Sequence, residues 1–213
     1  MGNIHVISGE DLGGISQKAL LICADRSIKE MRQSSITLAN TFSHAEFSRE
    51  IKTRVRKAGH YLSGTDCRYI LLKLIEQRYA DDPQTLQIFK DIRHPLFELY
   101  SFLAFAEATV AEEALQKISE DYSGFERDIF ALYNQFSQRV DDACAEYDID
   151  TYQHKMKHTL RGIAREYPAI ILDGFLFFSD EYKFLVRAAL EEDADVYLTV
   201  KTNSQRSVEP ASV

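Results

Sequence analysis

The stretch AIILDGFLFF, residues 169–178, joins a short apolar run to a carboxylate, a glycine and several aromatic residues. The run over residues 169–172 follows a proline and contains no polar residue, which favours a strand buried on both faces over the start of a helix. Asp173 ends this run, and Gly174 follows it. Ligands of open α/β sheets bind beside the carboxyl ends of the strands. Asp173 is therefore the first candidate for a functional residue.

The residues after this stretch predict a helix and then another strand. Ser179 can cap a helix whose apolar residues recur at helical spacing, with Asp180 and Glu181 in its positively polarised first turn. The run DVYLTVKT, residues 195–202, is rich in β-branched and aromatic residues. Two strands joined through a helix normally run parallel. The pattern predicts an α/β fold with a parallel sheet.

Three further apolar runs open the chain, at residues 4–9, 19–24 and 36–42, and are strand candidates. The linker EDLGGISQK between the first two is too short for a helical crossover, so we expect either a loop there or an antiparallel pairing. Residues 43–167 follow a helical pattern almost throughout. The predicted helices lie at about 43–57, 65–79, 84–92, 95–110 and 152–166, with Gly59 as a left-handed cap after the first. A further helix, before the last of these, carries an apolar stripe from Ile129 to Val140.

These patterns predict two structural regions and a tail. Residues 1–42 and 168–203 would form a small α/β core, and residues 43–167 would form a helical subdomain inserted into it. The aromatic stripes of the helices are typical of a core rather than of a cofactor site. The polar tail at 204–213 has no periodicity, and we expect it to be disordered.

Composition limits the classes of function. The chain has 213 residues, 45% of them hydrophobic, and a net charge of −8, so any binding to nucleic acid requires a local basic strip. Its three cysteines have no metal-ligand spacing and suit a reducing cytoplasm. No segment approaches the roughly 18 apolar residues of a membrane helix. We expect a soluble cytoplasmic protein with no membrane partner.

A basic strip lies within SHAEFSREIKTRVRKAGH, residues 43–60, where basic residues outnumber acidic ones. DNA phosphates could lie along such a helix. The hydroxyls and backbone N–H groups of Thr41, Ser43 and His44, where a strand enters the helix, also suit a phosphate. The alternative is a solvated helix face that acidic segments elsewhere balance.

Asp173 also has two interpretations. An Asp that ends a buried strand can hold Mg²⁺ through water beside a nucleotide, or it can accept backbone N–H bonds within its own turn. A nucleotide hydrolase of this topology carries GxxxxGK[ST] after its first strand, whereas this chain has SGEDLGGISQK. Glu10 and Asp11 in that loop would repel phosphate. We therefore expect the nucleotide pocket to be lost.

Three segments together resemble the N-terminal helicase-like region of superfamily 1 helicases of the UvrD/Rep type, and most closely the AddB subunit of AddAB helicase-nucleases. LLICADRSIKEMRQ, residues 20–33, is similar to a core strand of that family and its following helix. TFSHAEFSREIKTRVRKAG, residues 41–59, is similar to the segment that touches single-stranded DNA. Residues 169–202 resemble the DGF variant of motif II with its downstream helix and strand. The resemblance implies a P-loop-NTPase-like sheet with the helical block inserted.

The resemblance implies a function in DNA double-strand-break repair, in which this region binds or guides single-stranded DNA beside a helicase-nuclease partner subunit. An intact family member would need Mg²⁺ and ATP. Here the phosphate loop is missing and Gly174 stands where the family has its catalytic Glu, so we expect an ATPase-inactive chain that is either an N-terminal fragment or a stand-alone relative. Asp173 would be a vestigial Mg²⁺ ligand. The residues implied to meet DNA are Thr41, Phe42, Ser43, His44, Arg49 and Lys52.

Three alternatives stay open. Phe42 could equally anchor a core, because an aromatic residue that ends a strand is usually buried. The chain could be an assembly module that docks a helicase or nuclease partner without touching DNA, as its net charge of −8 and the acidic residues at 191–193 and 195 suggest. A residual Mg²⁺-dependent ATPase at Asp173 is the third.

Overall fold

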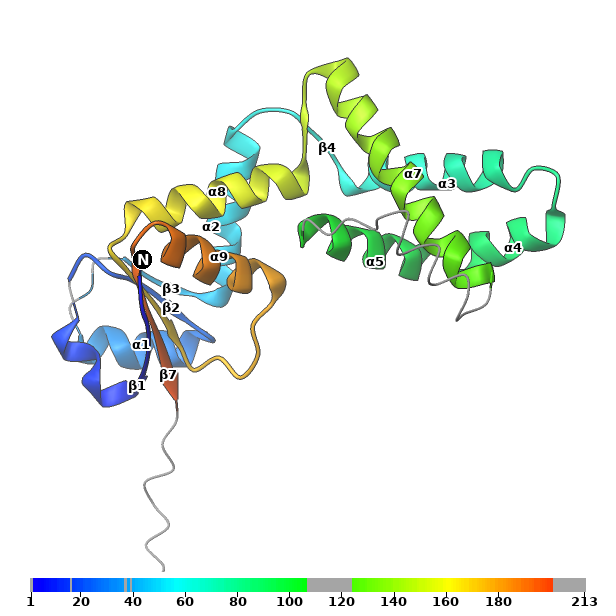
Figure 1. Ribbon diagram of the computed structural model, residues 1–213. Coiled ribbons are helices and arrows are strands. Elements are labelled where there is room, and N and C mark those ends of the chain that lie inside the picture. Colours follow the sequence, from blue (N-terminus) through cyan, green and yellow to red (C-terminus); the bar gives the residue numbers. More distant parts are fainter. Residues whose placement is uncertain (1, 16, 37, 39, 107–123, 201–213) are drawn as a thin grey trace, which may run out of the picture. The chain divides into compact units, whose positions relative to one another are not determined.

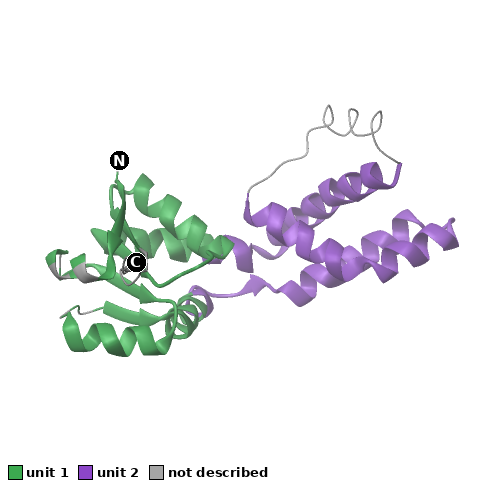
Figure 2. Ribbon diagram, turned by 90° about the horizontal axis from the view of Figure 1, so that it is seen from below, with its two compact units in different colours: residues 1–54, 157–213 green, residues 55–156 purple. Residues whose placement is uncertain are grey.

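The computed structural model describes residues 2–15, 17–36, 38, 40–106 and 124–200 of the chain, so the expected tail at 204–213 lies outside the described residues. The chain forms two compact units (Figure 2). The sheet unit comprises residues 1–54 and 157–213, and the helical unit comprises residues 55–156. The two units divide inside the helices that the sequence placed at 43–57 and 152–166, because both helices bury apolar residues within the sheet unit.

The sheet unit contains a five-stranded sheet in the order β1-β7-β6-β2-β3 (Figure 1). All of its pairings are parallel, which confirms the predicted α/β class with a parallel sheet. The strands are β1 (Ile4–Ser8), β2 (Leu20–Cys23), β3 (Asn40–Ser43), β6 (Ala169–Asp173) and β7 (Asp195–Val200).

The connection between the first two strands differs from one of the two expectations. β1 and β2 are parallel and are separated by β7 and β6, so the antiparallel pairing is wrong. The linker instead forms a loop that opens with a 3-10 helix, η1 (Gly9–Gly14). The linker can be short because it has no α-helix to accommodate. The third strand starts at Asn40 rather than at residue 36.

Helices cover both faces of the sheet (Figure 1). The first face lies under η1 and α1 (Arg26–Ser35), and its core includes Leu12, Leu21, Ala169 and Ile171. α1 has no fully buried residue, and periodicity alone did not predict it. The other face lies under α2 (His44–Lys57), α8 (Tyr152–Glu166) and α9 (Asp180–Glu191). Side chains alternate along each strand, so neighbouring strand residues face opposite helical layers.

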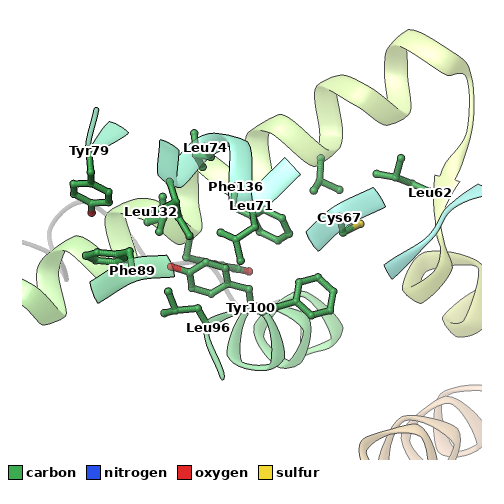
Figure 3. Close-up of a cluster of buried hydrophobic side chains, with 14 residues drawn as sticks. Leu62, Cys67, Leu71, Leu74, Tyr79, Phe89, Leu96, Tyr100, Leu132 and Phe136 are labelled. Atoms are coloured by element: carbon green, nitrogen blue, oxygen red, sulfur yellow. The ribbon is translucent and has the colours of Figure 1, made fainter. Parts of the chain in front are cut away.

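The helical unit has its own core of leucine and aromatic side chains (Figure 3). The Tyr100 hydroxyl, inside this core, donates a hydrogen bond of 2.6 Å to the carbonyl of Ile129, which satisfies its polar group. The aromatic stripes are therefore core, as predicted. Among the described residues, the helices that lie wholly within this unit are α3 (Gly64–Arg78), α4 (Pro83–Asp91), α5 (Arg93–Phe105) and α7 (Gly124–Tyr147).

Most helix boundaries agree with the sequence patterns. Gly59 follows α2 with φ of 96°, which confirms the left-handed cap. α5 begins before its proline and ends at Phe105, and the rest of the predicted 95–110 helix lies outside the described residues from 107 onward. Two-residue strands β4 (Tyr61–Leu62) and β5 (Asp150–Thr151) pair in parallel and were not predicted. None of the helices in the described part of the chain is long and apolar enough to cross a membrane.

Candidate site at the carboxyl edge of the sheet

The last residues of neighbouring strands form a row at one edge of the sheet. Cys23 of β2 is in register with Ser43 of β3 on one side and with Asp173 of β6 on the other. Asp173 and the start of α2 therefore lie at the same edge of the sheet. The two segments could share one site only if they did. Burial, followed by the charge of Asp173, raises the pKa of the Cys23 thiol to about 12, so this thiol stays neutral.

Asp173 is engaged by two side chains. Arg32 of α1 donates from Nε to Oδ2 at 2.6 Å and from Nη2 to Oδ1 at 3.3 Å. The hydroxyl of Thr199 on β7 donates a further hydrogen bond to Oδ1. The carboxylate is buried, with Asp173 only 2% exposed, and the opposite charge of Arg32 offsets the cost of burying it.

Arg32 also links two parts of the sheet edge. Its Nη1 donates to the carbonyl of Gly9 at 2.8 Å, immediately after β1. A Cβ at Gly9 would lie 2.1 Å from Arg32 Nη2, so any larger residue would displace the guanidinium. The sequence pointed to Arg32 only through the EMR triplet of the family resemblance, and nothing in that triplet indicated Asp173 as its partner.

These surroundings do not fit a hydrated Mg²⁺ at Asp173. Mg²⁺ keeps several waters and octahedral geometry, whereas this carboxylate is buried and already paired with a cation. In the part of the chain that the structure describes, no group of three or more His, Cys, Asp or Glu residues could hold a metal. The second interpretation of Asp173, as an acceptor of backbone N–H bonds within its own turn, also differs from the structure. The N–H of Gly174 donates to Thr199 Oγ1 at 3.1 Å rather than to Asp173.

Gly174 occupies a position that excludes a side chain. Its φ is +76°, a conformation that residues with a Cβ rarely adopt. A Cβ there would lie 2.4 Å from Cδ1 of Ile28 on α1. A glutamate at this position would therefore strain the backbone and displace the end of the Ile28 side chain.

The junction of β3 and α2 is held by Glu46. Its Oε2 accepts hydrogen bonds from Ser43 N at 2.8 Å and Ser43 Oγ at 3.0 Å, and it pairs with Lys29 Nζ at 2.7 Å. Lys29, followed by the Ser43 backbone, lowers the pKa of Glu46 to about 2. The Ser43 hydroxyl thus serves the cap of α2, a pattern readable from Ser and Glu three residues apart.

The predicted residues of this junction do not converge on one point. Thr41 pairs with Leu21 and Phe42 pairs with Ile22, so the two side chains face opposite sides of the sheet. Thr41 Oγ1 donates to the carbonyl of Leu38 at 3.4 Å. The ring of Phe42 packs edge-on against Phe47 at 6.1 Å, which favours a core role for Phe42.

His44 is exposed and begins α2. Its Nδ1 lies 2.8 Å from the hydroxyl of Tyr182 on α9, and burial raises the pKa of that tyrosine. The His44 ring also meets Phe175 edge-on, with centroids 6.4 Å apart. His44 therefore connects the start of the basic helix to the loop after Asp173.

Arg49 and Lys52 are exposed on α2, opposite the buried Phe47 and Ile51. Neither forms an ion pair with another residue that the structure describes, whereas Arg54 of the same helix pairs with Glu50 at 2.8 Å and Glu166 at 2.6 Å. An exposed cation without an acidic partner stays available to an external phosphate. This is the arrangement that the basic-strip interpretation requires.

No family model matches this chain, and no curated protein matches it either. The likeness to AddB-type subunits therefore stays a prediction from the motifs. Sequence reasoning missed the roles of Arg32, Thr199 and Lys29, whose partners are distant in the chain.

Proposed function

We propose that this chain is a helicase-like domain that binds single-stranded DNA and does not hydrolyse ATP. The observation that carries the proposal is the pair of exposed cations, Arg49 and Lys52, on the outward face of a helix that begins at the carboxyl edge of a parallel sheet. Ligands of open parallel sheets gather at this edge, and cations along a helix that starts there, without an acidic partner among the described residues, would hold DNA phosphates.

The buried ion pair of Asp173 supports the proposal that this chain does not hydrolyse ATP. Arg32 supplies the positive charge beside this carboxylate, and the positive φ of Gly174 disfavours a glutamate that could position water. The domain would retain the P-loop-like sheet without the chemistry of hydrolysis. Its proposed setting is an AddB-type helicase-nuclease in cytoplasmic double-strand-break repair, in which a partner subunit supplies the motor.

Fluorescence anisotropy with a labelled oligo(dT) tests the proposal. We expect affinity to fall as salt rises, because binding of the cations to phosphates releases counterions. Replacing both cations, Arg49→Ala with Lys52→Ala, should weaken binding. It should also reduce the slope of log affinity against log salt by about 0.7 for each phosphate that is no longer neutralised.

Arg187→Ala is the matched control, since it removes an exposed cation from α9 of the same unit. This variant should leave both the affinity and the slope unchanged. Addition of Mg-ATP should not alter binding by the native chain. The proposal fails if the oligonucleotide does not bind in a salt-dependent way, or if the double variant binds as the native chain does.

A further inference from the structure

The loop between β6 and α9 exposes two large apolar side chains at the same sheet edge. Leu176 and Phe177 are each 88% exposed, the largest values among the exposed large hydrophobic residues of the described chain. An apolar pair so fully exposed gains nothing from the fold itself. Its position next to the proposed DNA-binding helix suggests a role in binding.

The base of this loop is fixed. Phe175 packs against Tyr182 with ring centroids 4.9 Å apart and stacks on Phe178 at 5.7 Å. The N–H of Gly174 is held by the hydroxyl of Thr199 at 3.1 Å. A fixed base presents the tip in a defined place, so little ordering entropy is lost when a ligand binds there.

The loop is also joined to the basic helix. Phe175 contacts His44, which begins α2, and a helix rises about 1.5 Å per residue, so Arg49 and Lys52 follow at roughly 8 and 12 Å along its axis. Exposed aromatic rings combined with a track of cations are what single-stranded nucleic acid requires, because the bases stack while the cations hold the backbone.

We propose that Phe177, flanked by Leu176, is a stacking platform for a base of single-stranded DNA. This inference rests on the proposed function and extends it by naming the residue that meets a base. Asp180 at the start of α9 is paired with Lys183 at 3.0 Å, which reduces its repulsion of a nearby phosphate. Glu181 remains as the acidic neighbour in that first turn.

A base fits this loop better than a protein partner does. A stable protein interface buries about 800 Å² on each side and involves roughly 20–30 residues. Two adjacent side chains at the tip of a loop provide far less area than that. Stacking of a single base needs only one accessible ring face.

The chain contains no tryptophan, so Phe177→Trp places a single tryptophan, whose fluorescence can be excited selectively, at the proposed platform. We expect oligo(dT) to quench this fluorescence with the same midpoint as the anisotropy titration, since a stacked base quenches the ring that it contacts. Phe177→Ala should weaken oligo(dT) binding about fivefold or more. Its salt slope should stay that of the native chain, because no charge is removed.

Phe102→Ala is the control, since Phe102 is a half-exposed phenylalanine of the helical unit, and it should bind as the native chain does. One combination of results overturns the stacking platform but leaves the proposed function standing. In it, Arg49→Ala with Lys52→Ala weakens salt-dependent binding, whereas Phe177→Ala leaves that binding intact and the fluorescence of the Phe177→Trp variant does not change. Failure of the native chain to bind oligo(dT) overturns the proposed function as well. Light scattering that shows self-association of the native chain, abolished by Phe177→Ala, would assign the loop to a protein contact and overturn the platform.

Discussion

Asp173 and Arg32 form a buried ion pair whose partners come from the two separate segments of the sheet unit. Their side chains are 4% and 15% exposed, and the Arg32 Nε to Asp173 Oδ2 distance is 2.6 Å. Removing a charge from water is costly, and this cost is offset only while the partner and its hydrogen bonds are in place. The pair therefore makes the unit sensitive to the loss of either residue.

Asp173→Leu should lower the free energy of unfolding by about 3–5 kcal/mol, because it leaves the Arg32 guanidinium buried without a counter-charge. Urea unfolding followed by circular dichroism measures the change. Combining it with Arg32→Met should cost less than the sum of the two single changes, since both buried charges are then gone. Additive losses in this double-mutant cycle would show that the two side chains do not stabilise one another.

At the scale of elements, Glu46 joins three pieces of secondary structure. Its carboxylate, in the first turn of α2, accepts the N–H of the last residue of β3 and pairs with Lys29 of α1. These contacts hold the start of the basic helix against the sheet edge. They also make the junction depend on the charge of one carboxylate.

The depressed pKa of Glu46 predicts a pH dependence of stability. Its pKa falls from 4.5 to about 2 on folding, so the unfolded chain binds the proton more readily. The stabilisation is therefore fully present above about pH 4.5 and is lost as the pH falls toward 2. Unfolding midpoints of the native chain should drop across this window more steeply than those of Glu46→Gln, and parallel curves for the two proteins would contradict the assignment.

At the scale of the whole molecule, two cores stabilise two units. The helical core centres on aromatic and leucine side chains of α3, α4, α5 and α7, whereas the sheet core lies between the strands and their covering helices. A cavity in one core weakens the packing of that core alone. Local stability should then differ between the units.

Leu71→Ala should destabilise the helical unit by about 2–5 kcal/mol, because this side chain is fully buried. Hydrogen exchange detected by mass spectrometry should show reduced protection in α3, α4, α5 and α7 while the sheet strands keep theirs. Leu172→Ala in β6 is the matched control and should show the reverse. An equal reduction in both units after Leu71→Ala would mean that the chain unfolds as one cooperative body.

Local patterns predicted much of the fold and little of the side-chain chemistry. The apolar run of β6 and the periodicity of α8 were readable because each depends on residues close in sequence. The strand order and the pairing of Arg32 with Asp173 could not be read from local patterns. That pairing joins residues 141 positions apart in the chain. The pairing of β4 with β5 was missed because two residues are too few to show an alternating pattern.

The strand order also bears on how the chain folds as the ribosome makes it. Among the described strands β1 pairs only with β7, so Ile4 of β1 has no strand partner until Val196 of β7 has been synthesised. The whole helical unit emerges before β6 or β7 exists, and it can bury its core while β1 still lacks β7 and β2 still lacks β6. Unpaired strands in a nascent chain are prone to aggregation. Vectorial synthesis therefore leaves the first strands of this protein exposed for longer than any other part of the sheet, and at that stage they are where a chaperone would be most useful.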